Sequence, residues 1–267
     1  MSETKYFPTV EAIEKASQVL DEILEPTPFQ RNANLSDIYE AEVYLKREDL
    51  QMVRSYKIRG AYNKIRTIDP ELVTNGIVCA SAGNHAQGVA FSCSKLKIMG
   101  SIFMPVTTPR QKIEQVRMFG KEFIEIILTG DTFDAANSAA IAYAKENNKT
   151  FIPPFDDPKV MEGQGTIGRE ILNQSKEPLD DIFVPIGGGG LASGLGAYIS
   201  QMSPDTKIIG VEPGGAPCMK AAIENGGPVK LEHIDKFVDG AAVQLAGTHT
   251  YEVCRQVLDD IVVVPEG

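Results

Sequence analysis

Short apolar segments alternate along the chain with glycine-containing loops and amphipathic segments. Apolar runs with the length of a buried strand predict strands at 76–80, 98–104, 122–128, 180–186, 207–212 and 260–264. Apolar residues at every third or fourth position predict helices at about 9–24, 132–147 and 159–174. Further helices are expected from Lys57 to Ile68, after the loop SAGNH to Leu96, from Pro109 to Gly120, and after the four glycines to about 202. Since apolar strands that alternate with helices form parallel sheets covered on both faces, the pattern predicts an α/β protein.

The order of these segments predicts two units. The strand-helix series over 49–147 is expected to form a smaller domain inserted into a larger one, which comprises 1–48 and 148–267. The proline-rich stretch 151–155 is the expected crossover between them. Ahead of the smaller unit, residues 42–46 alternate polar and apolar side chains, which predicts a half-buried strand.

Two of the helix starts carry capping signals. Ser55 precedes the helix over 57–68 and is a plausible N-cap. Thr108, Pro109 and Gln111 have the spacing of an N-cap, a first-turn proline and a capping-box glutamine.

Composition limits the classes of protein to consider. The 267 residues are 43% hydrophobic and 23% charged, with a net charge of −10 and a pI near 4.9. This acidity argues against nucleic acid or an anionic membrane surface as a partner. No apolar run approaches the ~18 residues of a membrane span.

The cysteines and histidines exclude further classes. The four cysteines, Cys79, Cys93, Cys218 and Cys254, form no CxxC pair, and the N-terminus has no apolar signal core. We therefore expect a cytoplasmic protein. The three histidines have no metal-ligand spacing, and no GxSxG elbow of a serine hydrolase accompanies them.

Lys57 lies in the run SYKIRG, in the first turn of a predicted helix. That end of a helix carries positive partial charge, so a cation there is disfavoured. A partly desolvated lysine at this position would have a depressed pKa, which suits Schiff-base chemistry. Gly60, one turn later, indicates that another element packs close to the helix backbone. On local features alone, a solvated lysine that opens an ordinary helix is the alternative.

A run of four glycines, 187–190, lies between a buried strand and a helix. Glycines in this setting let backbone N–H groups converge on an anion at the helix N-terminus, so phosphate is the expected ligand. A dinucleotide site is the rival interpretation, because Gly187, Gly189 and Ala192 fit G-x-G-x-x-A and Glu212 ends the next strand.

The loop SAGNH at 81–85 has a similar build and precedes another predicted helix. Ser81, Gly83, Asn84 and the N–H groups of the helix could together receive a carboxylate. Simple helix capping by Asn84 and His85 is the alternative.

Together, SYKIRG, SAGNHAQG, GGGGLASG and the later VEP at 211–213 resemble the fold-type-II pyridoxal-phosphate enzymes over essentially the whole chain. Among these the similarity is greatest to the threonine (serine) dehydratases. The resemblance implies two parallel-sheet, three-layer domains of the tryptophan synthase β type. Tyr56 stands where phenylalanine is common in such motifs.

The resemblance also assigns roles to residues. Lys57 would be the catalytic Schiff-base lysine, and Asn84 would bind the phenolic oxygen of pyridoxal 5'-phosphate. The phosphate would be held by the backbone of Gly187, Gly188, Gly189, Gly190 and Leu191. The substrate carboxylate would be held by Ser81, Ala82, Gly83, Asn84 and His85.

The activity implied by the resemblance is the deamination of L-threonine, and of L-serine as a second substrate, by β-elimination of water. The products would be 2-oxobutanoate, or pyruvate, and ammonia, which is the first step towards isoleucine. The resemblance also implies a small amino-acid substrate and a homo-oligomer, a dimer or tetramer.

Two positions depart from related enzymes. Serine racemases carry a serine as second base at the place of Ala82, so racemisation is not expected. Metal-dependent relatives carry an acid where this chain has Cys218, so we expect no metal at Glu212.

The end of the chain is a third departure. Residues 260–264 form a predicted buried strand, and the sequence stops at Gly267 without the helices that follow in family members. Reduced activity is therefore expected. The alternatives are a remnant that only binds cofactor or oligomerises, and an NAD-dependent dehydrogenase that uses the GGGG loop.

Overall fold

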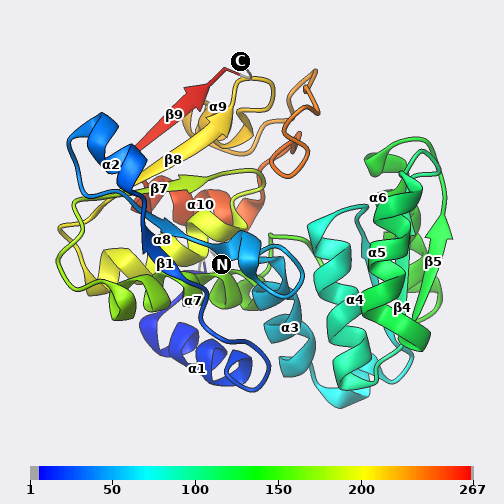
Figure 1. Ribbon diagram of the computed structural model, residues 1–267. Helices are drawn as coiled ribbons and strands as arrows, with labels where there is room; N and C mark the ends of the chain where they lie inside the picture. Colours follow the sequence, from blue (N-terminus) through cyan, green and yellow to red (C-terminus); the bar gives the residue numbers. More distant parts are fainter. Residues whose placement is uncertain (1–5, 266–267) are drawn as a thin grey trace, which may run out of the picture.

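The computed structural model describes residues 6–265 and has helices packed around three sheets (Figure 1). Its strands are β1 (Phe29–Arg31), β2 (Tyr44–Lys46), β3 (Ile77–Ala80), β4 (Gly100–Met104), β5 (Ile124–Leu128), β6 (Thr150–Phe151), β7 (Asp181–Pro185), β8 (Lys207–Pro213) and β9 (Asp260–Val264). Its α-helices are α1 (Val10–Leu20), α2 (Ala33–Tyr39), α3 (Lys57–Thr67), α4 (Asn84–Leu96), α5 (Arg110–Gly120), α6 (Phe133–Glu146), α7 (Pro158–Gln174), α8 (Gly190–Met202), α9 (Cys218–Asn225) and α10 (Thr248–Val257). Three short 3-10 turns, η1 (Glu48–Leu50), η2 (Pro70–Val73) and η3 (Lys121–Phe123), complete the list.

Parallel pairing forms the two larger sheets, as the sequence pattern predicted. One has the order β5-β4-β3-β6 and the other has the order β7-β8-β9. β1 and β2 pair in an antiparallel hairpin. β6 lies just past the expected domain boundary at 147 and still pairs with β3. The division into 1–48 with 148–267 and 49–147 stays a prediction.

Helices cover both faces of the four-stranded sheet. Ile77 and Cys79 of β3 pack in one cluster with residues of α3, α4 and α5. Val78 and Ala80, which point the other way, pack with Ala140 and Ala144 of α6. The period of two along β3 therefore produces a three-layer unit.

The three-stranded sheet differs from this pattern. One face packs against α7, α8, α9 and α10 in a single apolar cluster. On the other face Phe183 is 67% exposed, and Val262 and Val264 are also exposed. The expected coverage of both faces is therefore absent here within residues 6–265.

Both predicted N-caps are wrong. Tyr56 occupies the N-cap position of α3, and the Ser55 hydroxyl is buried without a partner in the described part of the chain. Pro109 occupies that position in α5, and the Thr108 hydroxyl donates to the Pro105 carbonyl instead. At Thr108 this local hydrogen bond to the backbone takes the hydroxyl away from the helix end.

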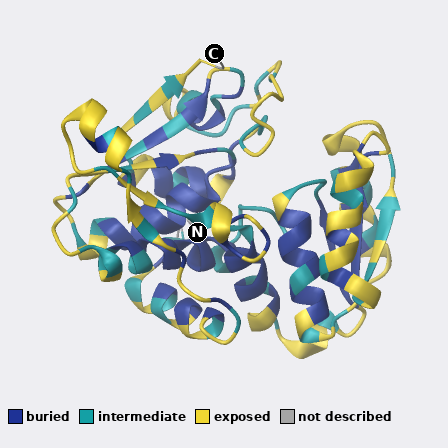
Figure 2. Cartoon of the chain, in the orientation of Figure 1, coloured by how far each residue is buried: buried dark blue, intermediate teal, exposed yellow. Residues whose placement is uncertain are grey.

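Helices α3, α7 and α8 pack unusually closely because glycines lie where they cross (Figure 2 shows their buried surfaces). A Cβ at Gly60 would lie 2.4 Å from Gln164 Nε2, and one at Gly163 would lie 2.6 Å from the Arg59 carbonyl. A Cβ at Gly194 would lie 2.1 Å from the Met161 carbonyl. The expectation that an element packs close to Gly60 is confirmed, and that element is α7.

A buried ion cluster anchors α3 to α7. The Arg59 side chain is 1% exposed and donates to the carboxylates of Glu48 and Glu170 and to the Thr166 hydroxyl. Lys46 Nζ donates to Glu170 as well, at 2.5 Å. Because two cations meet two carboxylates, the charges balance inside the protein, as buried charges require.

Replacing Gly194 by alanine should destabilise the fold by about 1–3 kcal/mol, because the added methyl overpacks the contact between α7 and α8. The loss should exceed the roughly 1 kcal/mol gained from the better helix propensity of alanine. Gly227→Ala is the matched control, since a Cβ there meets nothing within 4 Å. Urea unfolding of both variants gives the comparison, and equal midpoints would contradict the close-packing argument.

Candidate active site

Lys57 is the first residue of α3, as predicted, and its side chain is half-buried. Its Nζ donates to the Pro154 carbonyl at 2.8 Å and lies 5.6 Å from the centroid of the Tyr56 ring. Burial disfavours the charged form and lowers the pKa of Lys57 to about 8. The site therefore presents an amine whose neutral form is accessible near neutral pH.

The SAGNH loop joins the carboxyl end of β3 to the start of α4. The Ser81 hydroxyl accepts a hydrogen bond from Gly83 N at 3.1 Å, which closes the loop. Among residues 6–265, the amides of Ala82, Asn84, His85 and Ala86 meet no acceptor. The exposed Asn84 side chain also has no hydrogen-bond partner there. A loop of free amides at a helix N-terminus can receive a carboxylate.

The side chain of His85 is buried and bonds to the backbone beside Lys57. Its Nε2 lies 3.0 Å from the Ile152 carbonyl. Burial, with a smaller contribution from the Lys57 charge, lowers the pKa of His85 to about 3. The ring is therefore neutral, and only the backbone amide of His85 belongs to the anion-receiving loop.

The four-glycine loop joins β7 to α8. Gly189 has φ +92°, a conformation in which a glycine is favoured, and α8 begins at Gly190. No acceptor meets the amides from Gly187 to Ala192 anywhere in the described ranges. These amides and the positive end of α8 can receive a phosphate without a basic side chain in the loop.

Residues 152–157, which we term the central segment, connect the predicted site residues. The Ile152 and Pro154 carbonyls accept from His85 and Lys57. A Cβ on Gly188 or Gly190 would lie 2.4 Å or 2.9 Å from Phe155. The central segment therefore contacts Lys57, the SAGNH loop and the four-glycine loop.

Two acids of the central segment cap helices. Asp156 accepts from the amides of Thr248, His249 and Thr250 at the start of α10. Asp157 caps α7 and pairs with Lys64 at 2.7 Å. The sequence analysis identified 151–155 only as a crossover and missed these roles. The Asp157-Pro158 pair was the available signal, because it is typical of a helix N-terminus.

Glu212 lies at the end of β8 and is fully buried. Its carboxylate accepts from Met219 N and Lys220 N, both at 2.8 Å, at the start of α9. Burial raises the pKa of Glu212, and the two amide bonds offset this only in part. Because both oxygens are engaged, Glu212 is not available to a ribose, which argues against the dinucleotide interpretation.

Across residues 6–265, no group of three or more His, Cys, Asp or Glu side chains is placed to hold a metal ion. Within that same range, no helix has both the length and the apolar character needed to span a bilayer.

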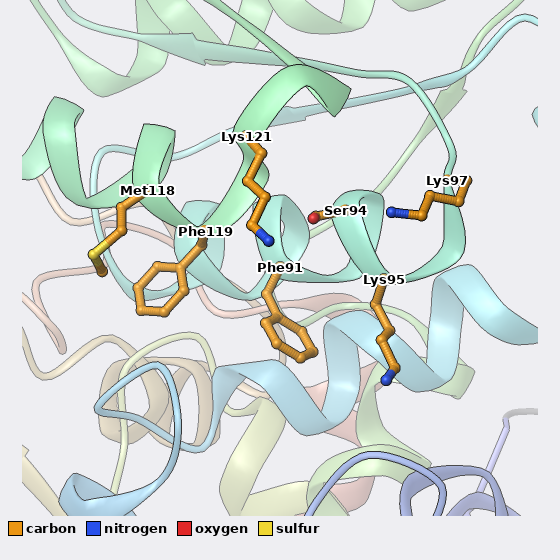
Figure 3. A pocket seen from close by; sticks show the side chains of 7 residues that line it. All are labelled: Phe91, Ser94, Lys95, Lys97, Met118, Phe119 and Lys121. Atoms are coloured by element: carbon orange, nitrogen blue, oxygen red, sulfur yellow. The ribbon is translucent and has the colours of Figure 1, made fainter.

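A groove of about 480 Å³ lies on the outer side of α4 and α5 (Figure 3). Its lining consists of Phe91, Ser94, Lys95, Lys97, Met118, Phe119 and Lys121. None of the predicted site residues lines it, and its aromatic floor packs against the core cluster that contains Ile58 and Tyr62. We therefore do not assign the catalytic site to this groove.

Parallel sheets, a half-buried lysine and two loops of free amides are the features expected of an α/β enzyme that binds a phosphorylated cofactor. Residues 20–267 match the family described as pyridoxal-phosphate dependent enzyme. The chain belongs to this family of pyridoxal-phosphate dependent enzymes. The predicted resemblance, the cofactor class and the fold-type-II architecture are thereby confirmed.

Curated relatives from bacteria are similar over nearly all of this chain. It is 56% identical over 258 residues to the L-threonine dehydratase biosynthetic IlvA of Halalkalibacterium halodurans, covering 97% of this chain and 62% of that protein. Identity to the protein of the same name from Bacillus subtilis is 55%, with 97% and 61% covered. The chain thus spans about three-fifths of the length of these relatives.

Solved structures of plant enzymes share the fold. The processed form of threonine deaminase isoform 2 from Solanum lycopersicum superposes with a TM-score of 0.90 at 39% identity, over 99% of this chain and 78% of that chain. Maize serine racemase superposes with a TM-score of 0.92 at 30% identity, over 98% and 78%.

The structure predicts an unusually reactive amine at Lys57. Competitive acetylation with trace acetic anhydride, followed by peptide mass spectrometry across a range of pH, should place its apparent pKa at about 8. An ordinary lysine titrates at about 10.4, so exposed lysines in the same digest provide the internal comparison. If Lys57 became reactive only at the pH of the exposed lysines, its desolvation would be refuted.

Proposed function

We propose that this chain binds pyridoxal 5'-phosphate through Lys57 and catalyses the deamination of L-threonine, with L-serine as a second substrate. The observation that carries the proposal is the Lys57 amine, held at 2.8 Å by the Pro154 carbonyl and lowered in pKa by burial. The names of the bacterial relatives support threonine as the substrate and a biosynthetic role. Isoleucine biosynthesis is the role that the family resemblance implies.

The two receptor loops fit the cofactor and an amino acid. The amides from Gly187 to Leu191 would hold the phosphate, and Asn84 would donate to the phenolic oxygen of the ring. The amides of the loop 81–85 would hold the substrate carboxylate. Phe155 packs beneath Gly188 and Gly190, which keeps the phosphate receptor close to the backbone that bears the Pro154 carbonyl.

Bound pyridoxal phosphate supplies an electron sink for the substrate's α-carbon. The residues of this chain supply position and proton transfer. A lysine with a pKa of about 8 is neutral in a substantial fraction of molecules near neutral pH, so its Nζ can accept the α-proton. When Lys57 Nζ is a free amine, its hydrogen bond to the Pro154 carbonyl orients it. The β-hydroxyl leaves as water, and the released enamine then takes up one water as it hydrolyses, which gives the 2-oxo acid and ammonia.

Ala82 favours elimination over racemisation. Racemisation needs a second group that returns a proton to the opposite face of the α-carbon, and the methyl group of Ala82 can neither accept nor donate one. We therefore assign a lyase activity, although maize serine racemase has a closely similar fold.

We further propose a cytoplasmic protein that assembles into a dimer or tetramer. All four cysteines are free and buried, which suits a reducing compartment. The exposed apolar residues on the three-stranded sheet, including Phe183, favour association. Sedimentation velocity measures the assembly directly.

Incubating the purified protein with pyridoxal 5'-phosphate and reducing it with borohydride should fix the cofactor on Lys57. Peptide mapping identifies the adduct, and L-threonine added to a separate, unreduced sample should yield 2-oxobutanoate and ammonia. Lys57→Ala should abolish both the adduct and the ketoacid, whereas the exposed Lys145→Ala should retain both. An adduct that maps mainly to another lysine would disprove the assignment of Lys57, and an adduct without ketoacid would leave only cofactor binding.

Replacing Gly188 by valine should weaken cofactor retention at least tenfold, or about 1.4 kcal/mol. The side chain would displace the Phe155 ring, which lies 2.4 Å from an added Cβ, and would obstruct the amides of the loop. Gly227→Val, in open space, is the control. Fluorescence titration with the cofactor and a melting curve together separate lost binding from lost folding. Unchanged affinity in a folded Gly188→Val protein would place the phosphate elsewhere.

A further inference from the structure

Two carbonyls of the central segment accept hydrogen bonds from two different helix starts. The Pro154 carbonyl accepts from Lys57 Nζ at the start of α3, at 2.8 Å. Two residues earlier, the Ile152 carbonyl is bonded at 3.0 Å to His85 Nε2, at the start of α4. Residues 152 to 154 are therefore held from both ends by side chains of the site.

We propose that His85 is a positioning residue, which fixes the Ile152–Pro154 backbone so that the Pro154 carbonyl orients the Lys57 amine. The inference uses the proposed function only to give Lys57 its catalytic importance. The geometry on which it rests, two hydrogen bonds to one short segment, exists in the protein without cofactor or substrate.

The hydrogen-bond chemistry fixes the state of the His85 ring. A carbonyl oxygen can only accept, so Nε2 must carry the hydrogen. The ring is buried and stays neutral, so it adds no second cation beside the Lys57 amine. A neutral donor in this place holds the backbone without opposing a proton on Lys57, which a charged donor would do.

Close packing gives the arrangement little freedom to adjust. Gly88, one turn after His85 on α4, faces the start of α3, and a Cβ there would lie 3.1 Å from Ile58 N and 3.2 Å from the Lys57 carbonyl carbon. The two helix starts therefore keep a fixed separation. If the His85 bond is removed, the part that can move is the central segment, and with it the Pro154 carbonyl.

His85→Phe tests the proposal because phenylalanine fills the ring's space and removes the donor. We expect the freed segment to admit water to Lys57, so that its apparent pKa rises and its acetylation at neutral pH falls about tenfold, the change that one pKa unit gives. His85→Gln retains an N–H donor and should restore most of the reactivity.

Asn63→Leu is the matched control. Asn63 is as buried as His85, and its Nδ2 donates to the Lys159 carbonyl at 2.7 Å between α3 and α7, outside the central segment. It should lower the melting temperature as His85→Phe does and leave the reactivity of Lys57 unchanged. If His85→Phe lowers the melting temperature while Lys57 keeps its wild-type pKa, the role of His85 is structural and the proposal is overturned.

A measurement on the unaltered protein keeps the test decisive if His85→Phe does not fold. Nitrogen-15 NMR should find His85 as the neutral Nε2–H tautomer with a slowly exchanging proton down to about pH 5, well above its depressed pKa. An Nδ1–H tautomer or a ring that titrates normally would overturn the proposal. Since acetylation and NMR need neither cofactor nor threonine, an absence of deamination would refute the proposed function and leave this inference standing.

Discussion

The structure depends on how residues 152–157 cross between the two parallel sheets. Past the Ile152 amide, which donates to the Val78 carbonyl, the backbone of this segment forms no ladder hydrogen bonds, so its buried carbonyls need other donors. His85 and Lys57 supply donors to Ile152 and Pro154, while Asp156 caps α10 and Asp157 caps α7. The need of these buried carbonyls for hydrogen-bond donors thereby brings the Lys57 amine and both loops of free amides to one place.

Two cationic side chains in the first turn of α3 show what environment does to a charge. Burial alone would lower the pKa of Arg59, but the carboxylates of Glu48 and Glu170 raise it, so the guanidinium remains charged. Lys57, two residues earlier, faces a neutral carbonyl and receives no such compensation, so its pKa falls. The same helix turn thus holds one structural cation and one amine prepared for chemistry.

Most of the longer strands could be predicted because they are apolar runs, and the end of α5 followed from Gly120. Helices α2, α9 and α10 escaped notice, since each spans no more than ten residues. Lys57 and the two glycine-bearing loops were recognisable because their chemistry requires particular residues, a lysine and glycines, that can be seen in the sequence. The central segment was not, because it acts through backbone carbonyls at Ile152 and Pro154, and any residue carries a carbonyl.

The acidity of the chain makes the use of backbone groups necessary. With a net charge of −10, the long-range field repels a phosphate, and the four-glycine loop has no Lys or Arg to oppose it. Free amides at a helix start act only at short range, so they favour an anion that is already seated. Lys57 is likewise bonded to a backbone carbonyl and not to a carboxylate, which would hold its proton. Selectivity for the bound group and reactivity of the amine therefore have a common origin in neutral, backbone-based recognition.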